Sequence, residues 1–150
     1  MDEVKNIVDT TQFIVIKIGN EQFGIDIKFI DNIVRMQSIT RVPKVPEYFK
    51  GVINLRGEVI PVMSLRLKMG LELDEYTKTT RIIIIKLEQH EGIGVIVDEV
   101  KEVVTLETEQ IEKLSYDKDE KQTFVYGVGK VDNSLISLLD LNAVLAEPQA

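Results

Sequence analysis

The chain of 150 residues is long enough for one compact domain, or for two small barrels that share a core. Its hydrophobic content of 44% is ordinary for a globular protein and argues against disorder. The net charge of −7, with basic residues dispersed among more numerous acids, argues against a nucleic-acid partner.

Cysteine is absent, which excludes disulfides, thiolate metal ligands and a cysteine nucleophile. The chain has no apolar run of about 18 residues that would predict a membrane span. Residues 1–12 are acidic and do not resemble a signal peptide. We therefore expect a cytoplasmic protein.

Short stretches rich in isoleucine and valine follow one another along the chain and are typical of strands. They are FIVIKI (13–18), FGIDI (23–27), GVINL (51–55), EVIPV (58–62), RIIIIKL (81–87), GIGVIV (92–97), TFVYGVGKV (123–131) and SLISLL (134–139). The charged stretch at 115–122 is expected to be a solvated loop.

Two segments combine a strand-like start with apolar residues at helical spacing, which indicates a strand followed by a helix. The apolar positions are Ile27, Ile30, Ile33 and Val34 in the first segment, and Val97, Val100, Val103 and Val104 in the second. Short helices are also expected after Ser64 and after Asp140, because both side chains can cap a helix N-terminus. Gly70 supplies a stop signal for the first of these helices.

An internal repeat organises the chain. The stretch at 51–65 aligns without gaps onto 127–141, and the stretch at 24–34 aligns onto 94–104. The pattern predicts a mainly β fold of two similar small barrels packed together, with short helices at their junction. We expect a single domain over 1–150, with one barrel over about 13–80 and the other over about 81–145, although terminal strands can cross over. One larger mixed sheet is the alternative.

The stretch KGVINLRGEVIPV at 50–62 predicts a hairpin with a two-residue loop at Arg56 and Gly57. This register pairs Leu55 with Glu58 and Ile53 with Ile60, and Gly57 takes the positive φ that tight turns require. Because proline donates no hydrogen bond to a ladder, Pro61 predicts an edge strand or a bulge. The equivalent loop of the repeat is Asp132-Asn133, an ordinary turn pair.

That comparison shows that the turn itself does not require an arginine. Arg56 is therefore either an exposed residue without a role or a recognition residue, because a guanidinium beside apolar surface is a common anchor at protein interfaces.

The sequence contains few residues in the patterns that catalytic or metal sites use. His90 is the only histidine, in a polar turn, and neither a second histidine nor a cysteine completes a zinc site. The serines lie outside any GxSxG context. Asp98, Glu99 and Glu102 lie at helical spacing, which favours a solvated face over a general acid–base pair. We expect no enzyme activity, no metal and no cofactor.

Three stretches together resemble the CheW family of chemotaxis coupling proteins: FIVIKIGNEQFGIDI at 13–27, FIDNIVR at 29–35, and TRVPKVPEYFKGVINLRGEVIPVMSLRLKMGL at 40–71. The likeness runs over essentially the whole chain. Related domains occur in the histidine kinase CheA and in CheV, but a stand-alone CheW unit is most similar to a chain of this length.

The resemblance implies two SH3-like five-stranded barrels. It also implies a non-catalytic adaptor that couples the regulatory domain of CheA to the cytoplasmic tips of methyl-accepting chemoreceptors in membrane-associated arrays. In the family the receptor tip, a helical hairpin, docks in an apolar groove between the barrels, and one end of the first barrel contacts CheA.

Carried over by position, the resemblance implies receptor contacts at Ile30, Asn32, Ile33, Arg56 and Gly57. It implies kinase contacts at Thr40, Val42 and Pro43. Asn32 departs from the family, which commonly has glutamate there, so an ionic link to Arg56 is lost. A neutral hydrogen bond to Arg56, or a charge supplied by Asp31, are the alternatives. Ser64 stands where the family usually has aspartate, and both residues cap helices.

Two other functions stay open besides the coupling of CheA to receptors. One is a CheW-like scaffold in a chemosensory pathway that does not control flagella. The other, of a different class, is a small barrel protein that binds a small ligand.

Overall fold

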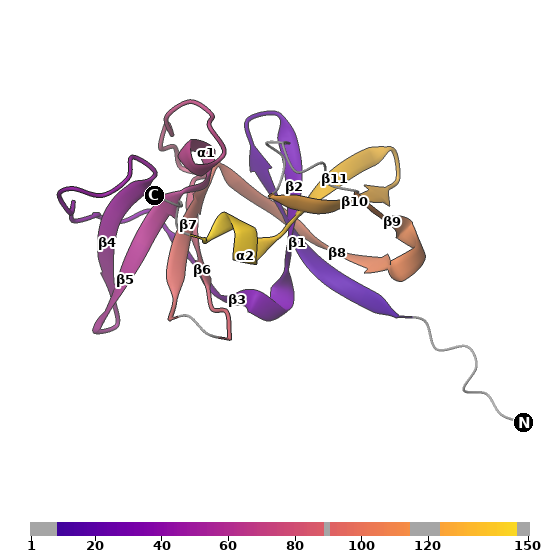
Figure 1. Cartoon of the computed structure of the whole chain (residues 1–150), viewed down its shortest axis with the longest axis horizontal. Helices are drawn as coiled ribbons and strands as arrows, with labels where there is room; N and C mark the ends of the chain where they lie inside the picture. The colour runs from indigo at the N-terminus through magenta and orange to yellow at the C-terminus, as the bar shows by residue number, and fades with distance from the viewer. Residues whose placement is uncertain (1–8, 89–90, 115–123, 147–150) are drawn as a thin grey trace, which may run out of the picture.

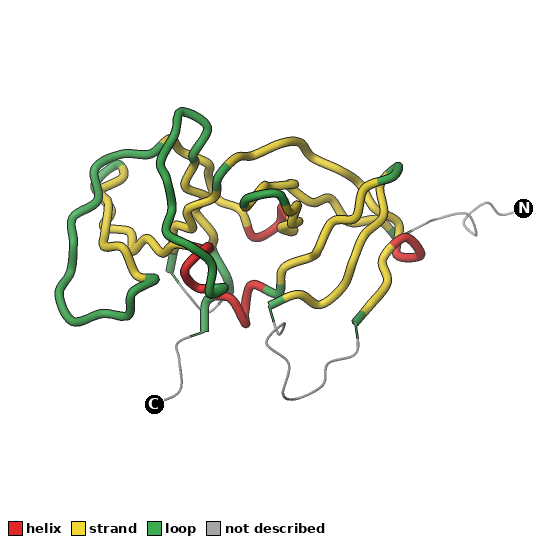
Figure 2. Tube along the Cα trace, turned by 90° about the horizontal axis from the view of Figure 1, so that it is seen from above, coloured by secondary structure: helices red, strands yellow, loops and turns green. Residues whose placement is uncertain are grey.

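The computed structural model describes residues 9–88, 91–114 and 124–146, which fold into two β-sheets with short helices between them (Figures 1 and 2). The first sheet has the strand order β3-β6-β7-β5-β4. Its strands are β3 (Ile30–Arg35), β4 (Phe49–Leu55), β5 (Glu58–Ser64), β6 (Arg81–Ile85) and β7 (Ile93–Val97). The mainly β architecture with two sheets is therefore confirmed.

The second sheet has the order β8-β1-β2-β11-β10-β9. Its strands are β1 (Thr10–Ile18), β2 (Glu21–Asp26), β8 (Glu99–Glu107), β9 (Ile111–Lys113), β10 (Val125–Val131) and β11 (Ser134–Leu139). The short strand β9 follows a 3-10 turn, η3 (Thr108–Gln110), and adds a sixth member to this sheet.

The two sheets repeat one topology. Within the aligned segments, β2 and β3 correspond to β7 and β8, and β4 and β5 correspond to β10 and β11. Each sheet contains one parallel pair, β5 with β7 in the first and β11 with β2 in the second. Each sheet is completed by a hairpin from the other half of the chain: β6–β7 joins the first and β1–β2 joins the second. A boundary near residue 80 therefore does not separate the sheets.

The two segments with apolar residues at helical spacing form strands, so the prediction of helices there was wrong. A 3-10 turn, η2 (Ile27–Phe29), is followed directly by β3, and the second segment forms β8. In β3, Ile30 and Ile33 pack against the cluster between the sheets and Val34 packs against the cluster of the first sheet, so apolar residues do not alternate along this strand. A bulge between Ile30 and Asn32 shifts the pattern further toward a helical spacing.

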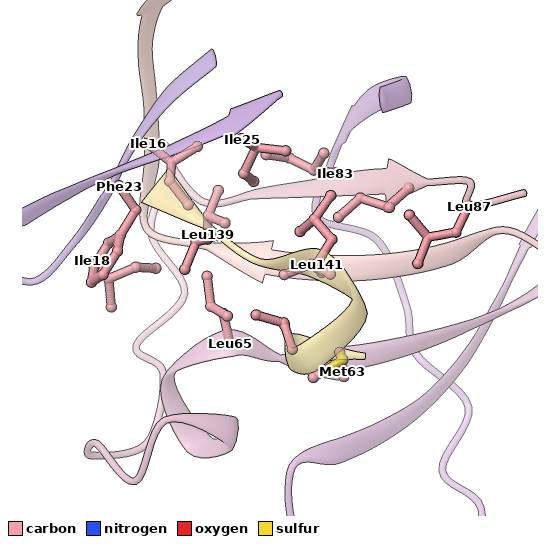
Figure 3. Packing of buried hydrophobic residues seen from close by; sticks show 14 residues of the cluster. Ile16, Ile18, Phe23, Ile25, Met63, Leu65, Ile83, Leu87, Leu139 and Leu141 are labelled. Atoms are coloured by element: carbon pink, nitrogen blue, oxygen red, sulfur yellow. The ribbon is translucent and has the colours of Figure 1, made fainter. Parts of the chain in front are cut away.

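The largest core cluster lies between the sheets. Figure 3 shows how Ile16 and Ile18 of β1, Ile83 of β6, and Leu139 and Leu141 gather in this cluster. Two smaller clusters lie within the individual sheets, around Phe13, Val15 and Leu106 in the second and around Ile53, Ile82 and Ile84 in the first. The sheets are thus joined by a continuous apolar core, in which each fully buried isoleucine contributes about 1.5–3 kcal/mol.

The two predicted short helices are confirmed at this junction. They are α1 (Leu65–Lys68) and α2 (Leu141–Val144). Ser64 Oγ accepts a hydrogen bond from Leu67 N at 3.1 Å, and Asp140 Oδ1 accepts one from Ala143 N at 3.3 Å. These caps start the helices as expected.

The β4–β5 hairpin has the predicted register, with Leu55 opposite Glu58 and Ile53 opposite Ile60. Strand β5 is internal to the sheet, so Pro61 does not mark an edge strand. Pairing of β5 with β7 begins only at Val62, so Pro61 precedes the ladder in which its missing N–H would be needed.

Candidate functional site

The tip of the β4–β5 hairpin projects from the first sheet at the lower left of Figure 1. Arg56 and Gly57 both have positive φ, 54° and 86°. Asn54 Oδ1 accepts a hydrogen bond from Gly57 N at 3.1 Å and closes the turn. Two successive residues with positive φ are typical of the type I′ loop, whose twist matches that of the flanking strands.

The positive φ of Gly57 is as predicted, but that of Arg56 was missed. Such a backbone is unfavourable for a residue with a long side chain, and asparagine, aspartate or glycine normally occupies it. Asp132, at the equivalent position of the β10–β11 hairpin, has a φ of 55°. The preference of two-residue loops for positive φ at both positions was the signal that could have found this. Arg56 therefore stands where backbone geometry favours other residues.

The hairpin combines this cation with exposed apolar surface. Val59 lies opposite Asn54 on the outer face and is 66% exposed. A hollow of about 460 Å³ lies beside the arm, lined by Glu58, Val59, Ile60, Lys86, Glu91 and Gly92. Among the described residues, no acid forms an ion pair with Arg56. The hairpin thus carries, among the described residues, an unpaired guanidinium at its tip and an exposed apolar side chain on its arm.

The predicted receptor contacts on β3 lie on a strand rather than on a helix. Ile30 and Ile33 are half-buried and pack against the central cluster between the sheets. Asn32 Oδ1 accepts a hydrogen bond from the adjacent Ile33 N at 2.9 Å. These residues therefore lie at the margin between the two sheets.

The structure does not bring Asn32 into contact with Arg56. Strands β6, β7 and β5 separate β3 from β4, which is the opposite edge of the sheet. Asp31 instead lies 3.9 Å from the ammonium of Lys86, which follows β6. Ile30 is opposite Ile85, so the start of β3 and the hollow near the hairpin lie toward the same end of the sheet.

Thr40, Val42 and Pro43 lie on the segment that links β3 to β4. Thr40 exchanges two backbone hydrogen bonds with Val52 of β4, at 2.8 and 2.9 Å. Val42 is 36% exposed, and Pro43 is exposed. Gly51 permits the close approach, because a Cβ at this position would lie 2.1 Å from Thr40 O. The segment therefore runs along the outer edge of β4, and Thr40, Val42 and Pro43 are exposed on it.

A polar network at α1 joins the two sheets. Arg66 donates to Asp98 through Nε at 3.0 Å and through Nη2 at 2.6 Å. Gly19 N, in the β1–β2 turn, donates to the same carboxylate at 2.7 Å. Burial opposes the ionisation of Asp98, but these hydrogen bonds outweigh it and lower its pKa below the ordinary value. Asp98 is therefore a structural link and not part of a solvated helical face.

Ser64 takes part in a second link. Its hydroxyl donates to Asp74 Oδ2 at 2.5 Å while it caps α1, so it ties the α1–β6 loop to the helix start. Burial raises the pKa of Asp74, although the hydrogen bond from Ser64 acts in the opposite direction. The sequence predicted the cap but not the carboxylate that it contacts.

Within residues 9–88, 91–114 and 124–146, histidine, aspartate and glutamate form no group of three that could hold a metal ion. His90 lies outside the described residues. None of the helices in the described part is long and apolar enough to cross a bilayer.

Comparison with known proteins identifies the family. A family model described as CheW-like domain matches residues 12–149. The chain is 38% identical to Chemotaxis protein CheW of Bacillus subtilis, covering 89% of this chain and 86% of that protein. It is 34% identical to Chemotaxis protein CheW of Helicobacter pylori, covering 91% and 82%.

A solved structure shares the fold. The crystal structure of scaffolding protein TtCheW from Thermoanaerobacter tengcongensis superposes with a TM-score of 0.83 at 32% identity, covering 91% of this chain and 92% of that one. The match includes both sheets, since it covers most of either chain. Together with the family match, it shows that this chain belongs to the CheW family of chemotaxis proteins.

Proposed function

We propose that this chain is a non-catalytic adaptor that couples the histidine kinase CheA to the cytoplasmic tips of chemoreceptors in membrane-associated arrays. The family match over residues 12–149 carries the proposal. The scaffold named in the related structure has the same fold across nearly its whole length. The exposed tip of the β4–β5 hairpin adds a feature suited to a protein partner, because guanidinium groups beside apolar surface are enriched at interfaces.

We assign the receptor contacts to Arg56 and Gly57 at the hairpin tip and to Ile30, Asn32 and Ile33 on β3. A helical hairpin would bury the half-exposed isoleucines and leave the polar groups to fix its orientation. The positive φ of Arg56 supports this assignment, because strain is kept at positions where the side chain has a role.

Co-sedimentation with receptor-tip fragments tests the receptor contacts. Arg56→Glu should weaken sedimentation with the fragment by roughly tenfold in Kd or more, since a reversed charge replaces an anchor. Asp132→Lys is the matched control, because it reverses a charge at the equivalent turn of the other hairpin, where φ is nearly the same. Equal loss in both variants would remove Arg56 from the contact.

We assign the kinase contacts to Thr40, Val42 and Pro43. They share one exposed segment that is fixed to β4, so a partner would meet a rigid edge. A pull-down with the CheA regulatory domain as bait tests this. Val42→Glu should lower capture of the chain by CheA and leave receptor-tip binding unchanged. Full capture by this variant would exclude the segment from the kinase contact.

A further inference from the structure

The end of the first sheet that lies away from the hairpin tip gathers basic side chains. Two adjoining hollows of about 490 and 570 Å³ lie there, and Met36 lines both. The cations that line them are Arg35, Arg41, Lys50, Lys78 and Arg81, and neither hollow is lined by an acid. In a chain with 25 acidic and 18 basic residues, such a group of cations is a local reversal of the average charge.

Two of these cations face each other across a strand pair. Arg35 at the end of β3 is directly opposite Arg81 at the start of β6. Like charges in this relation destabilise a sheet, and an anion between them offsets the repulsion. The guanidinium of Arg81 is held in place, because its Nη1 donates to Lys78 O at 2.8 Å and to Thr80 O at 2.9 Å.

The charges at this end are available to a partner. In the described part of the chain, the ion pairs use Lys28, Arg66 and Lys86 instead. Glu72 and Glu75 of the adjoining loop line a neighbouring hollow together with Arg66. That hollow shares Thr77, Thr79 and Thr80 with the second of the two basic hollows. Asp74, whose charge reaches Tyr76, is hydrogen-bonded to Ser64.

The hollows also contain apolar surface. Met36 and Ile39 pack against the cluster of the first sheet, and Tyr76 is 49% exposed. Their lining is contributed by β3, the β3–β4 segment, the start of β4, the α1–β6 loop and the start of β6. A ligand that contacts all of it has to be extended, acidic and partly apolar.

We infer that this face binds an acidic segment of a partner protein, with carboxylates on the arginine and lysine side chains and an apolar side chain near Tyr76. A single small anion would engage only a few of the five cations. A nucleic acid would be repelled by the net charge of −7 over the rest of the chain. An acidic peptide segment can pair with the local cations, and unlike a nucleic acid it does not extend a long negatively charged backbone over the rest of the surface.

The inference rests on the proposed adaptor function only in that the ligand is a protein. Arg41 adjoins Thr40 and Val42, so the basic face borders the assigned kinase contact without using those residues. If the chain binds the acidic peptide but neither CheA nor receptors, the proposed adaptor function is wrong and the basic binding face stands. If it binds CheA and receptors but not the peptide, only the inference about the basic face is wrong.

Fluorescence anisotropy of a short labelled peptide that alternates glutamate with leucine tests this site with the full chain. The peptide should bind, and its Kd should rise steeply with salt, since the contact is between exposed charges. A matched peptide with lysine in place of glutamate should not bind. Inorganic phosphate or single-stranded DNA that competes as well as unlabelled peptide would overturn the proposal in favour of a general anion site.

Charge-reversal variants locate the site. Arg35→Glu, Arg41→Glu and Lys78→Glu should each weaken peptide binding roughly tenfold. The controls Lys101→Glu and Lys130→Glu make the same change of net charge at exposed positions of the second sheet and should leave Kd within about twofold. Arg35→Glu should also raise the melting temperature, because it replaces a like-charge pair with an opposite-charge pair. Equal weakening by the controls would overturn the assignment.

Discussion

Arg56 has a backbone conformation that is unfavourable for its side chain. Its φ of 54° suits asparagine or glycine, and the equivalent position of the second hairpin has aspartate. The arms of the hairpin explain the fold, and Gly57 with Asn54 explains the turn. The guanidinium is left without a structural role in the described part of the chain, which is why we assign it to binding.

Replacing Arg56 with asparagine should stabilise the fold. Asparagine tolerates positive φ, so Arg56→Asn should raise the free energy of unfolding by about 0.5–1 kcal/mol. Urea denaturation measures this change. A decrease of that size would mean that the arginine supports the hairpin, and would argue against a role kept for binding alone.

Gly51 is a second position in this region at which the backbone conformation restricts the type of residue. Its φ is 141°, and a Cβ would lie 2.1 Å from Thr40 O, so Gly51→Ala should cost about 3 kcal/mol or more by breaking the Thr40–Val52 bridge. Gly57→Ala is the control, because its Cβ would meet open space and only the positive φ is unfavourable, at about 1 kcal/mol. Equal losses in chemical denaturation would contradict the role of the bridge.

At the scale of elements, features that depend on a few neighbouring residues were predictable. The register of the β4–β5 hairpin and the capped starts of α1 and α2 follow from turn residues, serine and aspartate at fixed offsets. The segment at 27–34 was mispredicted because both faces of β3 meet apolar neighbours and a bulge shifts the spacing. Periodicity alone cannot separate such a strand from a helix.

The two helix caps give a prediction at this scale. Ser64→Ala removes the cap of α1 and leaves the half-buried carboxylate of Asp74 without its donor, so we expect a loss of about 2–3 kcal/mol. Asp140→Ala removes only a cap and should cost about 1 kcal/mol. Thermal unfolding of both variants tests this difference. Equal costs would show that the contact with Asp74 contributes nothing.

At the scale of the whole molecule, the exchange of hairpins between the sheets was not predictable in detail. The internal repeat indicated two similar units, but which sheet each hairpin joins depends on the packing of Ile16, Ile83 and Leu139 in the shared core. The contacts between the site residues also depend on this packing, so they could not be predicted from the sequence. A hydrogen bond between Asn32 and Arg56 was one of two alternatives, yet three strands lie between the strands that carry these residues.

The link between Arg66 and Asp98 predicts how stability depends on pH. The pKa of Asp98 is lowered from its ordinary value of 3.8, so the unfolded chain takes up this proton first as the pH falls. The stabilisation is therefore present above the ordinary value and is lost as the pH falls through the folded one. Asp98→Asn should reduce the loss of stability between about pH 5 and pH 3.

Asp74 provides the comparison of opposite sign. Burial raises its pKa, so its contribution favours the folded state at low pH and is lost as the pH rises through the folded value. Asp74→Asn should therefore steepen the loss of stability on acidification, measured by urea denaturation across the same range. A change in the same direction as Asp98→Asn would contradict the assignment of the two carboxylates.

The role of Arg56 in recognition is tested most directly by measuring binding and folding separately. The Kd for a receptor-tip fragment and the free energy of unfolding are measured for the wild type, Arg56→Asn and the matched variant Asp132→Asn. We expect Arg56→Asn to bind roughly tenfold more weakly while it is at least as stable as the wild type, and we expect Asp132→Asn to bind normally. Unchanged affinity in Arg56→Asn would contradict the claim that this arginine is kept for recognition.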